Sequence, residues 1–151
     1  MSTTTTMAEL PGLVGTALGT SAWVEVTQEQ VNLFADATGD HQWIHVDVER
    51  AKAGPFGAPI AHGYLTLSLL VPLVAQVLTI SDAKMGVNYG LNKVRFPAPV
   101  PVGSKLRLTA TLKDVEEVTG GLQLTVAAVI EAEGVPKPVC IAEWVTRQYG
   151  G

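Results

Sequence analysis

The sequence predicts an α+β fold in which an antiparallel sheet wraps around a long central apolar helix. The run Tyr64–Ile80 contains no charged residue, and after Ser81 the pattern changes from helical to alternating periodicity. A helix that is apolar on nearly every side must be covered around its whole circumference. A curling sheet with one wet face provides that cover.

The size and charge of the chain narrow the range of possible functions. The chain has 151 residues, of which 47% are hydrophobic and 16% charged, so we expect a loose tail over residues 1–10 and a single domain over residues 11–151. The formal net charge is −4, with no basic run that could neutralise a string of phosphates. Nucleic acid is therefore not an expected partner, and the N-terminus has no basic region followed by an apolar run, as a secretory signal would.

Two features of the composition concern the compartment. The lone Cys140 cannot form an internal disulfide, so we expect a reducing cytoplasm. Its apolar neighbours indicate that its side chain packs in the core. The run Tyr64–Ile80 is at the lower length limit for a membrane span. Because Pro72 and Gln76 interrupt it and half-buried strands follow, we expect a buried helix, kinked or broken at Pro72, and no membrane association.

The N-terminal half shows one strand and two capped helices. Residues 21–26 alternate as a first strand, and Thr27 can cap a helix that Gly39 ends in a left-handed turn. Asp47 can cap a second short helix, which Gly54 ends. The residues from Gly39 to Asp47 therefore form a connection between two helix ends.

The C-terminal half alternates between apolar and polar residues. The stretch 105–112 places Leu106, Leu108, Ala110 and Leu112 on one face. Glycine and proline turns separate the later stretches. We expect at least five strands after Ser81: 87–91, 93–96, 105–112, 122–133 and 138–149.

The connection GDHQWIHVD, residues 39–47, carries the first candidate site. A loop between two helix ends can turn Asp40 and His45 toward one point. A carboxylate and an imidazole placed together can hold and deprotonate one water. The spacing equally allows Asp40 to cap backbone amides and His45 to pack in the core.

A metal site is not expected. His41 and His45 have the H-x-x-x-H spacing, and His62 could add a third ligand. Outside a helix that spacing does not place two imidazoles on one face, and no cysteine or glutamate lies in register with them.

The second candidate site is the start of the apolar helix. If that helix begins at Gly63, the amide of Gly63 is unpaired and could stabilise an oxygen that gains negative charge. The side chain of His62 is better explained as an N-terminal cap or as packing.

These motifs resemble a known signature. The pattern consists of Phe34, Thr38-Gly39-Asp40, Ile44-His45 and Ala51. It is similar to that of the (R)-specific enoyl-CoA hydratases, the MaoC-like branch of the hotdog superfamily. The likeness runs from the first strand to the final EWVTRQYG and includes PIAHGYLTLSLL and NYGLNKVRFPAPVPVGSKLRL. The resemblance implies a single MaoC-like hotdog domain over residues 11–151.

The resemblance also implies a reaction. Water would add reversibly to trans-2-enoyl-CoA to give (R)-3-hydroxyacyl-CoA, so the same site would serve as a 3-hydroxyacyl-CoA dehydratase of fatty acid metabolism. Asp40 and His45 would hold the water, and either could return a proton to C2. The amide of Gly63 would bind the thioester oxygen. No cofactor or metal is implied. Members of the branch are typically dimers whose sheets join edge to edge, so we expect a homodimer.

The chain departs from that family where Gln42-Trp43 replaces the usual Asn-Pro. Gln42, Trp43 and His62 are therefore candidates for the wall of the substrate pocket. Two other functions fit the same fold: a hotdog acyl-CoA thioesterase, and a non-catalytic acyl-thioester-binding subunit of a heterodimeric dehydratase. The sequence does not specify the acyl length, the choice between CoA and a carrier protein, or the pathway.

Overall fold

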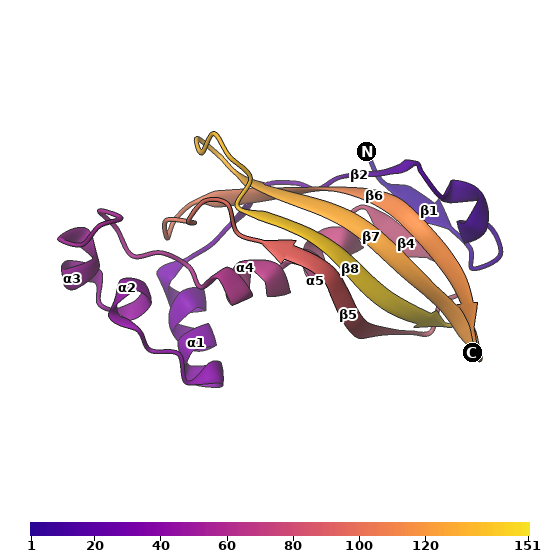
Figure 1. The fold of residues 1–151 in the computed structure, drawn as a ribbon, viewed down its shortest axis with the longest axis horizontal. Coiled ribbons are helices and arrows are strands. Elements are labelled where there is room, and N and C mark those ends of the chain that lie inside the picture. The colour runs from indigo at the N-terminus through magenta and orange to yellow at the C-terminus, as the bar shows by residue number, and fades with distance from the viewer.

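A curved sheet of six strands dominates the structure, a computed structural model that describes residues 1–151 (Figure 1). Along the sheet the order is β2-β6-β7-β8-β5, and β3 also pairs with β6. These pairs are all antiparallel. The strands are β2 (Ala17–Thr20), β3 (Val24–Glu25), β5 (Met85–Arg95), β6 (Lys105–Val118), β7 (Gly121–Ala132) and β8 (Cys140–Tyr149). The predicted α+β class is confirmed.

The inner face of β6 forms the centre of the core. Leu106, Leu108, Ala110 and Leu112 are fully buried, as their alternation predicts. Opposite them on β7 lie further apolar residues, such as Ile130 beside Leu108. Burial of one whole face of this ladder supplies the main hydrophobic stabilisation of the fold.

The apolar helix is shorter than predicted and is broken. It consists of α4 (Gly63–Ser68) and α5 (Leu70–Ala75), and the last residues of the apolar run form the strand β4 (Leu78–Ile80). The break at Leu69 lies three residues before Pro72, which has no N–H to donate to the Ser68 carbonyl. The predicted break is confirmed, although it lies at Leu69 and not at Pro72 itself.

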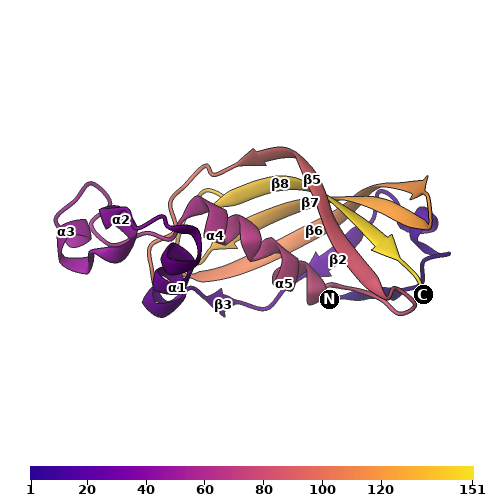
Figure 2. The ribbon, with the colours of Figure 1, turned by 90° about the horizontal axis from the view of Figure 1, so that it is seen from below.

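Full enclosure of the helix is also wrong for the single chain. The sheet curves over one side of α4 and α5 (Figure 2). Tyr64 and Val71 on the other side remain exposed, at 70% and 41%.

The first ten residues, expected to be loose, contact the body of the protein. The strand β1 (Thr3–Thr5) pairs in parallel with β4, and the short 3-10 helix η1 (Leu10–Leu13) buries Leu10 completely. The sequence did not indicate the strand β1, because its residues are polar threonines and its partner β4 lies where a helix was expected.

Two strand boundaries also differ from the prediction. The expected first strand reduces to β3, and β2 precedes it. Residues 87–91 and 93–95 belong to one strand, β5, whose pairing with β8 shifts register twice, and Phe96 lies just beyond its end. Four strands rather than five therefore follow Ser81.

Three helices extend beyond one end of the sheet (Figure 2). They are α1 (Gln28–Thr38), α2 (Trp43–Val46) and α3 (Val48–Lys52). Their predicted caps are confirmed: Thr27 Oγ1 accepts from the Gln30 N–H at 3.1 Å, and Asp47 Oδ1 accepts from the Arg50 N–H at 3.1 Å. None of the helices is long and apolar enough to span a membrane.

Candidate active site

Asp40 is positioned by the end of α1. Gly39 adopts a φ of 84°, and its N–H bonds to the Ala35 carbonyl, which closes the helix as the sequence predicts. The chain then turns, and the Asp40 N–H donates to Thr38 Oγ1 at 3.3 Å. The Asp40 carboxylate accepts only a long bond, 3.4 Å, from the Gln42 N–H. Its exposed oxygens thus keep capacity for a further ligand.

The orientation of His45 is set by a backbone carbonyl. On α2, His45 is 6% exposed, and its Nδ1 lies 2.6 Å from the Ile60 carbonyl oxygen. Because a carbonyl only accepts, Nδ1 must carry the hydrogen, and in the neutral ring Nε2 is left with a free lone pair. The side-chain amide of Gln28 donates to the His45 carbonyl at 2.8 Å and fixes the short helix.

The protonation state of His45 suits a base. Burial lowers its pKa from the ordinary 6.5, and the neighbouring His62 lowers it further, while the Ile60 bond and Asp40 act in the opposite direction. The imidazole is therefore neutral near pH 7 and can accept a proton at Nε2.

His62 joins the two residues. Its Nε2 donates to the Asp40 carbonyl at 2.9 Å, and its ring stacks on His45 with centroids 3.8 Å apart. Phe34 contacts the same ring at 4.8 Å. His62 precedes α4 but forms no capping hydrogen bond. Of its two predicted roles, packing is confirmed and capping is wrong.

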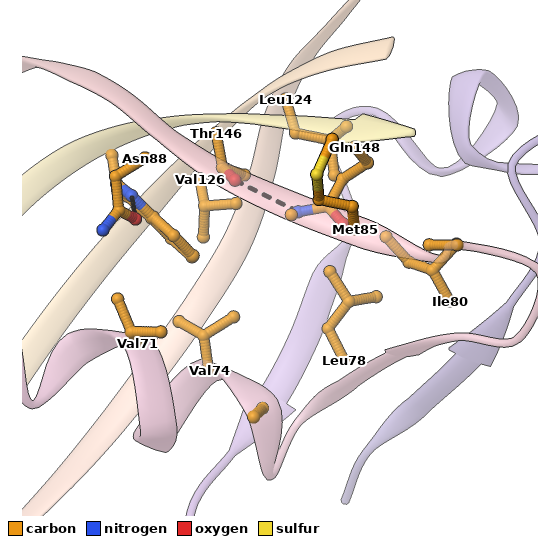
Figure 3. Close-up of a pocket in the computed structure, with 14 residues that line it drawn as sticks. Val71, Val74, Leu78, Ile80, Met85, Asn88, Leu124, Val126, Thr146 and Gln148 are labelled. Atoms are coloured by element: carbon orange, nitrogen blue, oxygen red, sulfur yellow. Dashed lines mark hydrogen bonds between the residues drawn. The ribbon is translucent and has the colours of Figure 1, made fainter. Parts of the chain in front are cut away.

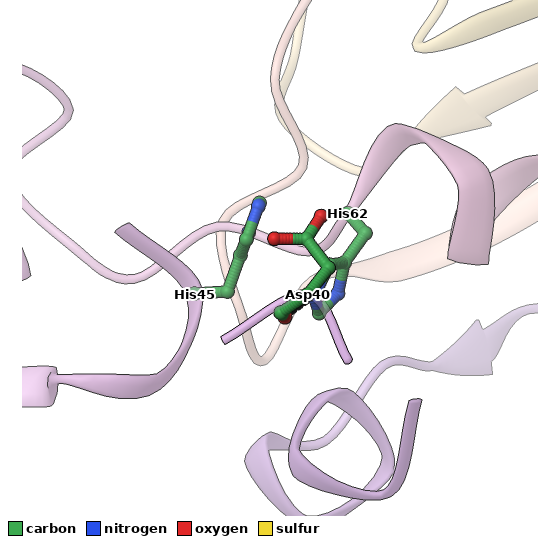
Figure 4. A group of neighbouring side chains, drawn as sticks. All are labelled: Asp40, His45 and His62. Atoms are coloured by element: carbon green, nitrogen blue, oxygen red, sulfur yellow. Dashed lines mark hydrogen bonds between the residues drawn. The ribbon is translucent and has the colours of Figure 1, made fainter. Parts of the chain in front are cut away.

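Asp40, His45 and His62 thus form one cluster (Figure 4). A candidate ligand atom from each lies within 4.8 Å of the others. The two imidazole planes are only 23° apart, and a metal ion lies close to the plane of each ring that binds it. Stacked rings cannot aim their lone pairs at one ion, so this arrangement fits proton transfer and does not fit a metal centre.

Two adjoining cavities open at the cluster. The first, about 330 Å³, is lined by Asp40, His45, His62, Gly63, Tyr64 and Phe96. The second, about 360 Å³, also includes His45, Gly63 and Phe96 and extends to Thr66 and Val139. Gly63 is the first residue of α4, where a backbone amide has no helical partner. A Cβ at this position would meet the Phe96 ring at 3.2 Å, so glycine lets that ring pack directly against the start of α4.

Gln42 and Trp43 lie outside both cavities. The indole of Trp43 packs beneath the Arg50 guanidinium, 4.3 Å from the ring centroid, and against Gly54. The prediction that these two residues line the substrate pocket therefore finds no support in the structure. The bulk of Trp43 supports the loop instead.

Two other candidate side chains lie away from the cluster's chemistry. His41 pairs with Asp36 at 3.0 Å on the surface, and this hydrogen bond raises the His41 pKa. Cys140 is buried, and burial raises the pKa of its thiol to about 11. The core-packing interpretation of Cys140 is confirmed.

Comparison with protein families now places the chain. Residues 9–134 match the model of the MaoC like domain. The chain belongs to the MaoC-like family.

Named relatives cover nearly the whole length of the chain. It is 57% identical over 148 residues to the 3-hydroxyacyl-thioester dehydratase Z of Mycobacterium tuberculosis, which covers 97% of this chain and 98% of the relative. It is 43% identical over 143 residues to nodulation protein N of Rhizobium leguminosarum, covering 93% and 89%. The (R)-hydratase of A. caviae superimposes with a TM-score of 0.69 at 25% identity, covering 88% and 94%. The predicted hotdog fold and MaoC-like resemblance are confirmed.

One residue that lines these cavities was not identified from the sequence. Thr66 lines the cavity shared by His45 and Gly63, and its hydroxyl is buried without a partner. A signal was present, since Thr66 is a polar residue in an apolar run, one helical turn after Gly63.

Proposed function

We propose that this chain is an (R)-specific enoyl-thioester hydratase, a hydro-lyase that equally dehydrates 3-hydroxyacyl thioesters. The observation that carries the proposal is the pairing of the Asp40 carboxylate with the free Nε2 of a neutral His45 beside the Gly63 amide. A non-catalytic binding subunit has no need of such a proton-transfer pair. The names of the relatives support the same reaction.

The reaction needs only these groups and water. Asp40 and His45 hold one water between them; its oxygen bonds to C3 as the pair accepts a proton, and the C2–C3 double bond becomes single. A proton then passes from the pair to C2 on the same face, so both groups return to their starting states. Electron density moves to the thioester oxygen in the transition state, where the Gly63 N–H binds it. Because the thioester itself acidifies C2, no cofactor is required.

An acyl chain can continue along the broken helix. A cavity of about 380 Å³ lies between α5 and the sheet, lined mainly by apolar side chains such as Val71, Val74 and Val126 (Figure 3). Since α4 begins at Gly63 and α5 carries Val71 and Val74, the helix connects the reacting groups to this cavity. Its apolar lining suits the hydrocarbon tail of a thioester.

The assay that tests this function follows enoyl absorbance. Crotonyl-CoA and longer trans-2-enoyl-CoAs are mixed with the protein, and the product is oxidised by dehydrogenases specific for each enantiomer. We expect bleaching without release of thiol, and an (R) product. Release of free thiol would instead identify a thioesterase. Binding without turnover, with activity appearing only on addition of another subunit, would identify a non-catalytic partner.

The partner that best completes the molecule is a second copy. Strand β5 is an edge of the sheet and exposes Met85, Val87, Tyr89 and Leu91 along its length. Pairing of two β5 edges would satisfy their backbone groups and cover these side chains.

Light scattering tests the homodimer. We expect a mass of two chains for the wild type, and a shift toward one chain in Val87→Asp/Leu91→Asp, because charges would be buried at the joint. Glu25→Asp, a substitution on the exposed strand β3, is the control. A double variant that keeps the wild-type mass would contradict the β5 interface.

A further inference from the structure

The cavity beside His45 and Gly63 has an almost entirely apolar wall. Its twelve lining residues include Phe56, Phe96, Val100 and Val139, and only His45 and Thr66 contribute polar side chains. A thioester oxygen that gains charge there has few groups with which to form hydrogen bonds.

Thr66 is in an unusual state for a buried hydroxyl. The residue is 1% exposed, and its Oγ1 has no hydrogen-bond partner. A threonine within a helix commonly bonds back to the carbonyl four residues earlier, here that of His62. That carbonyl accepts the Thr66 backbone N–H at 3.1 Å, but the hydroxyl does not bond to it. A buried, unpaired hydroxyl destabilises a fold, so its presence calls for an explanation.

The position of Thr66 supplies one. Thr66 lies three residues after Gly63 on α4, and side chains of a helix lean toward its N-terminus. Its hydroxyl therefore leans toward the first turn of α4, where the Gly63 amide lies. Both residues line the same cavity. A carbonyl oxygen has two lone pairs, of which one amide can engage only one.

We infer that Thr66 is a catalytic residue whose hydroxyl donates the second hydrogen bond to the thioester carbonyl oxygen, beside the Gly63 N–H. This inference rests on the proposed function. It explains the missing partner, because the acceptor of the Thr66 proton arrives with the substrate. It also assigns Thr66 a part in charge stabilisation, separate from the proton transfer of Asp40 and His45.

Thr66→Val tests the inference, since valine keeps the shape of threonine and removes the hydroxyl. We expect kcat for enoyl-CoA hydration to fall about 100-fold, as for removal of one oxyanion donor, while Tm stays the same or rises because an unpaired polar group has been lost. Thr66→Ser keeps the hydroxyl and is expected to retain most of kcat. The kcat of Thr66→Val should be lower than that of the wild type by the same factor at every pH, so the midpoint of its pH profile should not move.

A spectroscopic readout complements the rates. In the complex with a carbonyl-labelled thioester, the C=O stretch should lie at lower frequency in the wild type than in Thr66→Val, because a hydrogen bond weakens that bond. Thr125→Val, which removes a buried threonine hydroxyl on β7, serves as the control and should shift neither the frequency nor kcat.

The outcomes separate the two proposals. A Thr66→Val variant with wild-type kcat and an unshifted C=O frequency would overturn the role of Thr66 and leave the hydratase intact. Equal losses of kcat in Thr66→Ser and Thr66→Val would also overturn it, because they would indicate packing. If the wild type does not hydrate any enoyl-CoA, the proposed function fails, and the frequency of a bound thioester still decides the role of Thr66.

Discussion

The long strands β6, β7 and β8 and the helical connection from α1 to α3 are held together in different ways. Each pair of neighbouring strands shares ten or more residue pairs, and together they bury a continuous apolar face. The connection buries few side chains and depends on individual polar contacts, such as His45 to Ile60 and His62 to Asp40. The first region supplies most of the buried apolar surface, and the second holds the groups that we propose to react, so substitutions should separate stability from activity.

The largest expected effect is the loss of activity on changing the reacting pair. Asp40→Asn and His45→Gln should each lower kcat/KM for crotonyl-CoA hydration by about 10²- to 10⁴-fold, because each removes a positioned proton-transfer group. Steady-state kinetics measure the loss, and thermal unfolding should show little change.

Asp36 and His41 provide matched controls for Asp40 and His45. Asp36→Asn and His41→Gln make the same chemical changes on the exposed surface and should keep near wild-type rates. Near wild-type kcat/KM in a folded Asp40→Asn or His45→Gln would remove the basis for the mechanism.

The opposite pattern is expected in the sheet. Leu108→Ala should lower the free energy of unfolding by about 2–5 kcal/mol, because it opens a cavity at a fully buried position. Denaturant titration measures the change, and kcat per folded molecule should stay close to the wild type. Leu33→Ala, at an exposed position on α1, is the control. An intact free energy of unfolding in Leu108→Ala would contradict the assignment of stability to β6.

His62 contacts both reacting residues, so its variants should change both properties. His62→Leu removes the hydrogen bond to the Asp40 carbonyl and the stacking on His45. We expect kcat to fall about 10- to 100-fold through misplacement of the pair, with a lower Tm. His62→Gln, which can still donate to that carbonyl, should recover part of kcat. Equal kcat in wild type and His62→Leu would show that the site is positioned without His62.

The smallest effect is a shift along the pH axis. The pKa of His45 is lowered below 6.5 in the folded enzyme, so the base form persists as the pH falls from 7. The plot of kcat/KM for hydration should therefore fall on the acid side with its midpoint below pH 6.5. Between the folded and unfolded pKa values, the unfolded chain binds more protons, so this group also makes stability rise with pH. An acid-side midpoint above pH 6.5 would contradict a lowered pKa of His45.

The sequence specified the regular parts of both regions. Thr27, Gly39 and Asp47 were predicted as helix punctuation because capping depends on side chains a few residues away. The alternation from Leu106 to Leu112 predicted the buried face of β6 for a similarly local reason.

Contacts between distant residues were not predictable in this way. β1 becomes a strand only because β4 lies beside it, more than seventy residues later. His62 stacks on His45 across an intervening loop, and the packing of Trp43 against Gly54 follows from the turn that closes α3. Asp40 and His45 were candidates from their residue types and their place between two helix ends, and the family resemblance gave them a role. Thr66 lies within the matching stretch PIAHGYLTLSLL, but the sequence does not show that its hydroxyl is buried and unpaired beside a cavity.

The exposed edge of β5 has a consequence for the life of the newly made chain. Until another surface covers it, an eleven-residue strand presents open backbone groups and apolar side chains, which is a template for misassembly. The two register shifts in β5 disturb its regularity and make it a poorer template for an arbitrary strand. If two copies join at this edge as proposed, the residues that direct assembly also protect the chain from aggregation. Val87→Asp/Leu91→Asp should then stay in solution as single chains, because its added charges oppose pairing with any other strand.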